Sequence, residues 1–127
     1  MVNQEKNDKL ISHPTMAEIK EVVYSMNPQS AAGPDGINRH FFQKCLHIIN
    51  KDLSEVIMDF FTGQEIPKYF SYSCIVLLPQ VSNPKKVKDF RPISLSNFIS
   101  KIIYKLLSKR WSPILLVLPQ SVWFFKW

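Results

Sequence analysis

The amino-acid sequence predicts an α+β fold in which a helical amino-terminal part is followed by two short strands and a packing helix. Apolar residues recur at helical spacing between residues 15 and 61, and again between residues 97 and 110. Between these regions, a β-branched apolar run ends at Pro79, which is typical of a strand. The chain has 127 residues, of which 46% are hydrophobic and 20% charged, which indicates about one folded domain.

The first ordered element is expected at Thr15, after a polar tail over residues 1–14 that we expect to be disordered. Thr15 and Glu18 form a capping-box pattern, in which each side chain hydrogen-bonds the backbone N–H of the other residue. Pro28 cannot continue the helix that follows, so this helix should end near Asn27. Its single apolar face consists of Met16, Ile19, Val22, Val23 and Met26.

A turn is expected at residues 31–36, because proline presets its φ angle and glycine permits positive φ. The helical period then returns over residues 37–61, with a break near Asn50. Two short packed helices or one bent helix explain this pattern equally well.

Two strands and a last helix complete the predicted fold. The run over residues 73–78 is expected to be a buried strand. A second strand is expected over residues 91–95, where Pro92 suits an edge or the start of a strand. The last helix should cover residues 97–110, with Asn97 as its N-cap. Its apolar face consists of Ile99, Ile102, Ile103, Leu106 and Leu107.

The positive charge is concentrated in one stretch. The whole chain has a formal net charge of +6, whereas residues 81–110 contain eight basic residues against Asp89 alone, a net +7. Such a local field attracts polyanions, because phosphate neutralisation supplies most of the non-specific affinity for nucleic acid. A solvated basic face without a ligand explains the composition as well. Three of these cations fall four apart on the last helix, as a lysine ridge or simply its wet side: Lys101, Lys105 and Lys109.

Other classes of protein fit the sequence poorly. Cys45 and Cys74 are the only cysteines, and their spacing suits neither a disulfide framework nor a zinc knuckle. A reducing, intracellular compartment is therefore expected, with nucleus and cytoplasm both open. The uncharged residues 111–125 are too few for a membrane helix, which needs about 20. His40 and His47, with Cys45 between them, lack the spacing of metal ligands. We therefore expect no metal and no cofactor in this chain. The short uncharged segment likewise leads us to expect no membrane partner.

Four short strings occur in one order along the chain: Gly33-Pro34-Asp35-Gly36, residues 75–79, residues 89–95 and residues 101–105. In this order and spacing they resemble the reverse transcriptase of non-LTR (LINE-type) retrotransposons, most of all those of plant genomes. The resemblance implies a partial reverse transcriptase domain over residues 15–118 and a non-matching tail over residues 119–127.

In that family, the matched region is the amino-terminal extension and the fingers of a right-hand polymerase. The resemblance implies an incomplete polymerase fold in which the two strands pair as a fingers hairpin and Arg91 faces the nucleotide triphosphate. Arginine suits this role because its planar fork binds phosphate oxygens in pairs. Without the motif, Arg91 reads as an ion-pair partner of Asp89. The family usually has lysine where this chain has Gln80, so phosphate affinity there should be lower. The lysines of the hairpin loop would supply compensating charge: Lys85, Lys86 and Lys88.

For the template, the resemblance points to the turn and to the last helix. The turn residues are Gly33, Asp35 and Gly36, and the helix residues are Lys101, Lys105 and Lys109. A purely structural role explains the turn without any ligand, because proline and glycine there make a tight connection into the next helix.

The carboxylates that polymerases use to hold two metal ions are missing from the sequence. In the resembled family they lie in the palm, whereas this chain has no Asp-Asp pair and no acidic residue after Asp89. We therefore expect a truncated reverse transcriptase domain that binds RNA or DNA template and nucleotide triphosphate but is inactive without its palm and thumb segments. Magnesium would be needed only by the complete enzyme. Two alternatives stay open: a stand-alone basic nucleic-acid-binding module, and the non-functional product of a decayed element.

Overall fold

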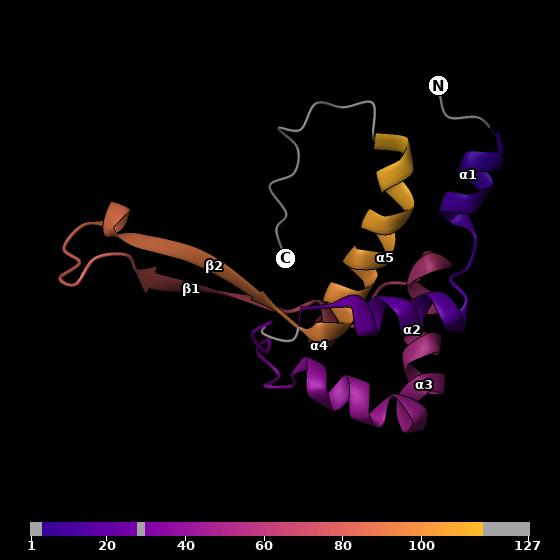
Figure 1. Cartoon of the computed structure of the whole chain (residues 1–127), viewed down its shortest axis with the longest axis horizontal. Helices are drawn as coiled ribbons and strands as arrows, with labels where there is room; N and C mark the ends of the chain where they lie inside the picture. Colours follow the sequence, from indigo (N-terminus) through magenta and orange to yellow (C-terminus); the bar gives the residue numbers. More distant parts are fainter. Residues whose placement is uncertain (1–3, 28–29, 116–127) are drawn as a thin grey trace.

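The computed structural model describes residues 4–27 and 30–115. Its elements are α1 (Gln4–Ile11), α2 (Met16–Ser25), α3 (Arg39–Phe61), α4 (Lys68–Ser71), β1 (Ser73–Pro79), β2 (Phe90–Ser96) and α5 (Phe98–Leu115), with a single 3-10 turn at Val87–Asp89 before β2. The helices form one body, and the two strands form a ribbon that extends away from it (Figure 1). This mixture of helices and a small antiparallel sheet agrees with the predicted α+β class.

The hydrophobic core lies between α2, α3 and α5. The predicted apolar faces of α2 and α5 both point into it, so the helical spacing of these residues is explained by burial. Each fully buried isoleucine or leucine side chain contributes about 1.5–3 kcal/mol by leaving water. The buried core residues are Ile19, Val22, Val23, Met26, Phe42, Leu46, Leu53, Ile57, Phe98, Ile102, Ile103 and Leu106.

The helix α3 is continuous through the predicted break, and Figure 1 shows that its axis bends. Of the two arrangements considered, one bent helix is therefore correct. The amide Nδ2 of Asn50 donates to the carbonyl O of His47 at 3.3 Å, a local bond of the kind that weakens regular helix geometry. At its start, the side chain of Asn38 caps α3 by accepting a hydrogen bond from the N–H of Phe41 at 3.1 Å.

The helix α1 occupies residues for which a disordered tail was expected. Its carboxyl end is held from α5, because Nη1 of Arg110 donates to the carbonyl O of Leu10 at 3.2 Å and also to that of Ser12. The last carbonyl groups of a helix have no partner within the helix, so such a donor stabilises its end. The partner lies about 100 residues further along the chain, so this support for the helix could not be derived from the local sequence.

The guanidinium of Arg110 also joins α5 to α2 and α3. Its Nε and Nη2 donate to the two carboxylate oxygens of Glu18 at 3.0 and 2.9 Å, and it lies 5.0 Å from the ring centroid of Phe61. These hydrogen bonds hold the pKa of Glu18 below its ordinary value of 4.5. Thr15 caps α2 as predicted, through the N–H of Glu18 at 3.2 Å. The capping box is only half formed, because the carboxylate of Glu18 is bound by Arg110.

The turn before α3 packs on the junction between β2 and α5. A Cβ atom on Gly33 would come within 2.6 Å of the carbonyl O of Ser96 and 2.7 Å of the backbone N of Asn97. Gly36 has a φ of 71° and donates its N–H to the carbonyl O of Gly33 at 3.0 Å, which closes the turn. Both glycines therefore have a structural role at the root of the ribbon.

Asn97 precedes α5 as predicted, but its side chain does not cap this helix. It is buried, and its Nδ2 donates to the carbonyl O of Tyr69 at 2.8 Å while its Oδ1 accepts from the N–H of Asp35 at 3.3 Å. The hydroxyl of Ser100 donates to the carbonyl O of Phe70 at 2.6 Å. These bonds attach α4 and the Gly33 turn to the start of α5.

The strands β1 and β2 pair antiparallel, from Ser73 opposite Ser96 to Pro79 opposite Phe90. The expected pairing is present, but the prediction that β1 is buried is wrong. Every β1 residue except Cys74 is exposed. The reason is that the described part of the sheet has two strands, and both of its faces stand clear of the helical core.

Replacing Arg110 by alanine should lower the free energy of unfolding near neutral pH by about 3 kcal/mol, because Glu18 would keep a partly buried carboxylate without its partner. The lowered pKa of Glu18 gives the pair a pH dependence: its stabilisation is present above the ordinary pKa of 4.5 and is lost as the pH falls through the folded-state pKa. The wild type should therefore lose more stability than Glu18→Gln between about pH 6 and about pH 3. Urea denaturation measures both effects.

Glu21→Gln is the matched control for this prediction. In the wild type, the carboxylate of Glu21 pairs with Nζ of Lys109 at 2.6 Å, but the side chain of Glu21 is 66% exposed and that of Lys109 is 45% exposed. Exposed pairs contribute little, so this variant should change the free energy of unfolding by less than about 0.5 kcal/mol. Equal losses in Arg110→Ala and Glu21→Gln would contradict the assigned importance of the Arg110 contacts.

Gly33→Ala should destabilise the chain by about 2 kcal/mol, because the added methyl group would press on backbone atoms that cannot move independently. Gly63→Ala is the control: this glycine has a φ of 85° but open space around its Cβ position, so only conformational strain of about 1 kcal/mol is expected. Hydrogen exchange should become faster in α4 and at the root of the ribbon in Gly33→Ala alone. Unchanged exchange there would show that the turn does not hold the ribbon.

Candidate nucleic-acid interface

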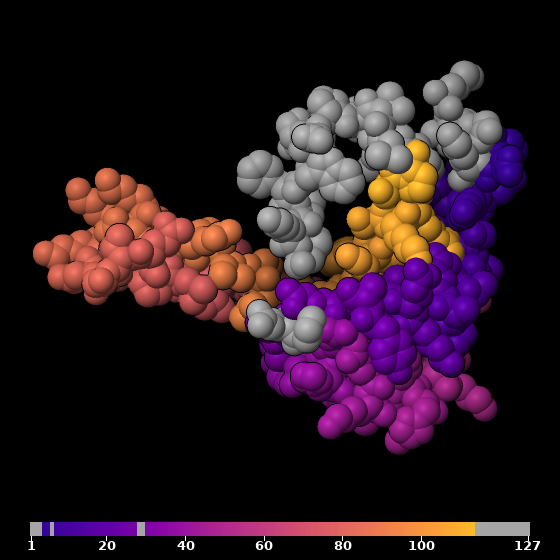
Figure 2. Space-filling view, in the orientation of Figure 1, coloured from indigo at the N-terminus to yellow at the C-terminus, as the bar shows by residue number. Residues whose placement is uncertain are grey.

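The ribbon of β1 and β2 forms a narrow arm beyond the helical body (Figure 2). A two-stranded ribbon is only marginally stable by itself in water, so its position depends on the attachments at its root. Those attachments are the Asn97 and Ser100 hydrogen bonds to α4 and the packing of Gly33. The residues at the tip therefore project from a fixed base.

Residues that lie opposite each other share one face of the ribbon. The register places Arg91 opposite Leu78, at the outer end of the face that also carries Val76 and Ile93. On the other face, Ile75 is 73% exposed and Leu77 is 55% exposed. Contiguous apolar exposure of this kind marks an interaction surface.

The loop at the tip is ordered by the only acidic residue of the basic stretch. The Oδ2 atom of Asp89 accepts hydrogen bonds from the backbone N–H groups of Lys85 and Lys86, both at 2.9 Å. These two bonds hold the pKa of Asp89 below its usual value of 3.8. The side chains of the predicted phosphate-binding lysines Lys85, Lys86 and Lys88 are all exposed. The carboxylate of Asp89 is thus bound by backbone N–H groups of the loop.

Arg91 is exposed, and no ion pair joins it to Asp89 in the part of the chain that the structure describes. The reading of Arg91 as a partner of Asp89 is therefore wrong. Its role in nucleotide binding stays a prediction. The backbone N–H of Gln80, where the resembled family has lysine, donates to the carbonyl O of Asp89 at 2.7 Å and closes the strand pairing.

The three lysines of α5 do not act as one ridge. Nζ of Lys101 donates to the carbonyl O of Ala31 at 2.6 Å and to Oγ of Ser30 at 3.2 Å, and burial lowers the pKa of this lysine below 10.5. Lys109 is paired with Glu21, as described above. Lys105 alone is exposed without a partner among the described residues. Binding of nucleic acid by Lys101 or Lys109 would have to compete with these contacts.

The turn residues predicted to lie near the template are placed at the root of the ribbon. Gly33 and Gly36 shape the turn, and Oδ1 of Asp35 accepts from the N–H of Ile37 at 3.0 Å. They do not lie with the lysines of the tip. Contact of Gly33, Asp35 and Gly36 with nucleic acid stays a prediction, while their structural role is supported by these contacts.

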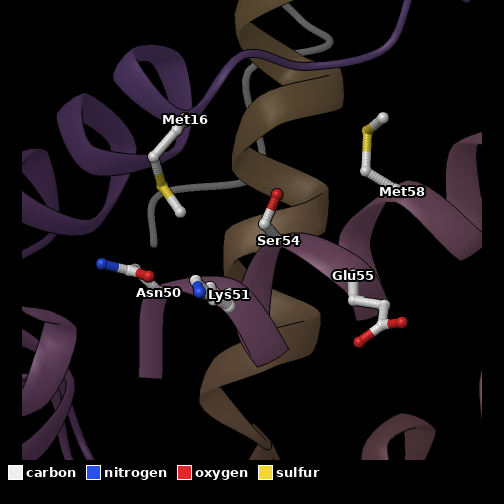
Figure 3. Close-up of a pocket in the computed structure, with 6 residues that line it drawn as sticks. All are labelled: Met16, Asn50, Lys51, Ser54, Glu55 and Met58. Carbon is white, nitrogen blue, oxygen red and sulfur yellow. The ribbon is translucent and has the colours of Figure 1, made fainter. Parts of the chain in front are cut away.

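A shallow hollow of about 450 Å³ lies on the helical body and contains none of the predicted site residues. Figure 3 shows its lining, which comes from the start of α2 and the second half of α3: Met16, Asn50, Lys51, Ser54, Glu55 and Met58. Among the described residues, no three His, Cys, Asp or Glu side chains are placed to hold a metal ion, and Cys45 and Cys74 are both free thiols. No helix in the described ranges is long and apolar enough to cross a membrane. The predicted tail over residues 119–127 lies outside the described residues.

Sequence reasoning missed two exposed aromatic residues at the root of the ribbon. Tyr69 in α4 is 66% exposed, and Tyr72, just before β1, is 65% exposed. The available signal was the dense aromatic string Tyr69-Phe70-Ser71-Tyr72 directly after Pro67. A string this short has no clear period, so its exposure could not be derived from spacing.

No protein-family model matches the chain. The chain is similar to the Transposon TX1 uncharacterized 149 kDa protein of Xenopus laevis, with 26% identity over 115 residues. The match covers 91% of this chain but 9% of that protein, so the chain spans less than a tenth of the relative's length. By its name, this relative is the protein of a transposon.

Proposed function

We propose that the chain is the fingers region of a non-LTR retrotransposon reverse transcriptase, in which the ribbon holds the phosphates of the template and of the incoming nucleotide. The observation that carries this proposal is the exposed cationic tip, where three lysines project from an ordered loop and Arg91 lies at the adjoining end of β2. The similarity to the transposon protein and the motif order supply its family context.

The charges of the tip are available because the nearest carboxylate is already bound. Asp89 accepts two backbone N–H groups and makes no described ion pair with Arg91. Arg91 therefore keeps its guanidinium fork for phosphate oxygens, which it can bind in a bidentate manner. A loop that is ordered before the ligand arrives also avoids part of the entropic cost of binding.

Nucleotide transfer would require a segment other than the one described. The sequence has no acidic residue after Asp89, so the carboxylates for two-metal chemistry would come from palm segments of a longer protein. On this proposal, the chain alone binds nucleic acid and does not polymerise it. The exposed apolar faces of the ribbon favour a fingers region within a larger enzyme over a stand-alone basic module, because water is a poor partner for Ile75 and Leu77.

Replacing Lys85, Lys86 and Lys88 together by alanine should weaken binding to a single-stranded RNA. Each lost phosphate contact reduces the slope of log affinity against log salt by about 0.7, so the slope should fall by about 2. Fluorescence anisotropy at several salt concentrations measures affinity and slope together. Failure of the wild type to bind at low ionic strength would contradict the proposed function.

The control is a second triple variant with the same loss of charge, Lys20→Ala, Lys44→Ala and Lys51→Ala. These three lysines are exposed on α2 and α3 of the helical body. They should contribute little to the salt dependence if the ribbon is the contact surface. Equal effects of the two triple variants would show that net charge alone drives the binding.

Arg91→Ala should weaken nucleotide triphosphate binding roughly tenfold, since a charge-assisted hydrogen bond contributes about 1.5–3 kcal/mol. Arg91→Lys keeps the charge but loses the planar fork, so it should recover only part of the affinity. Equilibrium binding of a fluorescent nucleotide triphosphate distinguishes the variants. Wild-type affinity in Arg91→Ala would remove this residue from the site.

A further inference from the structure

The exposed tyrosines at the root of the ribbon are not explained by the phosphate contacts proposed for its tip. Tyr69 and Tyr72 are 66% and 65% exposed, although each carries a large aromatic ring. Tyr69 lies in the single turn of α4, and Tyr72 is the C-cap residue that follows this turn, three positions later. Together they present two aromatic rings to solvent next to the start of β1.

Buried polar groups hold this turn in place. The carbonyl O of Tyr69 accepts from Nδ2 of Asn97, which directly precedes α5, and that of Phe70 accepts from Oγ of Ser100 in the first turn of α5. Asn97 is 2% and Ser100 5% exposed. The ring of Tyr69 also packs edge-on against Phe70, with 5.4 Å between the centroids. The tyrosines are thus presented by an anchored backbone, while their own rings add little to the core.

The distance between the tyrosines and the cationic tip fits a short nucleic-acid strand. The strand β1 has seven residues, which corresponds to about 23 Å between Tyr72 and the start of the loop. A stacked strand has one phosphate per about 3.4 Å, so about seven nucleotides would span this distance. One strand can therefore contact both ends of the ribbon.

We infer that Tyr69 and Tyr72 form a base-stacking platform for single-stranded nucleic acid whose phosphates continue along the ribbon to the lysines at its tip. The inference rests on the proposed function and adds a second type of contact to it. Aromatic rings stack on any base, because every base has a π-face, so the platform tolerates all sequences. Bases within a duplex are stacked on each other, and the platform therefore favours single strands.

The test compares two labelled strands of about 12 nucleotides, one of thymidines and one abasic strand with the same phosphates. The full chain should bind the thymidine strand more tightly. The double variant Tyr69→Ala, Tyr72→Ala should lose roughly tenfold in affinity for the thymidine strand and nothing for the abasic strand. Its salt slope should stay that of the wild type, because no charge is removed.

Two control variants separate stacking from other effects. Tyr69→Phe, Tyr72→Phe keeps both rings and should keep the preference for thymidine over the abasic strand. Tyr24→Ala removes a tyrosine of α2 that is 55% exposed on the helical body, and it should bind both strands like the wild type.

Equal binding of the two strands by the wild type would overturn the stacking platform and leave the phosphate contacts of the tip standing. An equal loss for both strands in the double alanine variant would also overturn it, because the tyrosines would then act through the fold of the ribbon. Unchanged affinity in that variant would assign the tyrosines to another contact, such as a protein surface. Absence of binding to either strand at low salt would overturn the proposed function as well.

Discussion

The buried side-chain amide of Asn97 is the interaction on which the position of the ribbon depends. It satisfies a carbonyl of α4 with its donor and an N–H of the Gly33 turn with its acceptor, so three segments meet at one residue. The absence of a side chain on Gly33 permits this approach, because a Cβ would contact the backbone of residues 96 and 97. A projecting two-stranded ribbon has little stability of its own. Its direction, and with it the position of every cation at the tip, is therefore set at its root.

Contacts of α5 with the rest of the helical body explain why the basic stretch, residues 81–110, divides into two parts. The helix α5 packs against α2, and α2 carries Glu18 and Glu21, which bind Arg110 and Lys109. Lys101 faces carbonyl and hydroxyl groups of the segment before the Gly33 turn. These cations stabilise the body. The ribbon has no carboxylate except Asp89, whose oxygen is taken by backbone N–H groups, so its lysines stay exposed. Composition predicted one continuous basic surface for polyanions over residues 81–110. Among the described residues, packing leaves the unpaired cations mainly at the tip of the ribbon.

Elements whose cause is local could be predicted from the sequence. The apolar faces of α2 and α5 and the Thr15 cap are examples. The pairing of the two strands was instead expected from the resemblance to non-LTR reverse transcriptases. Features whose cause is distant could not be predicted. The helix α1 depends on Arg110, and the use of the Asn97 amide depends on Tyr69 and Asp35. The exposure of β1 was missed for a different reason, since a continuous apolar run is normal for a strand covered on both faces, and spacing alone does not reveal whether a cover is present.

The hydrogen-bond pattern makes the two edges of the ribbon unequal. In an antiparallel ribbon, pairs of residues that hydrogen-bond to each other alternate with pairs whose backbone groups point outward. The bond from the N–H of Gln80 to the carbonyl O of Asp89 makes residues 80 and 89 a hydrogen-bonded pair. The backbone N atoms of Pro79 and Pro92 therefore point away from the partner strand. Neither proline therefore removes a bond from the ladder. Along the outer edge of β2, however, Pro92 interrupts the row of N–H donors, whereas Ile75 and Leu77 keep theirs on the outer edge of β1. A further strand would find a continuous row of partners only along β1, because an edge proline blocks pairing. Such a strand would extend the sheet on the side opposite to the strand that carries Arg91.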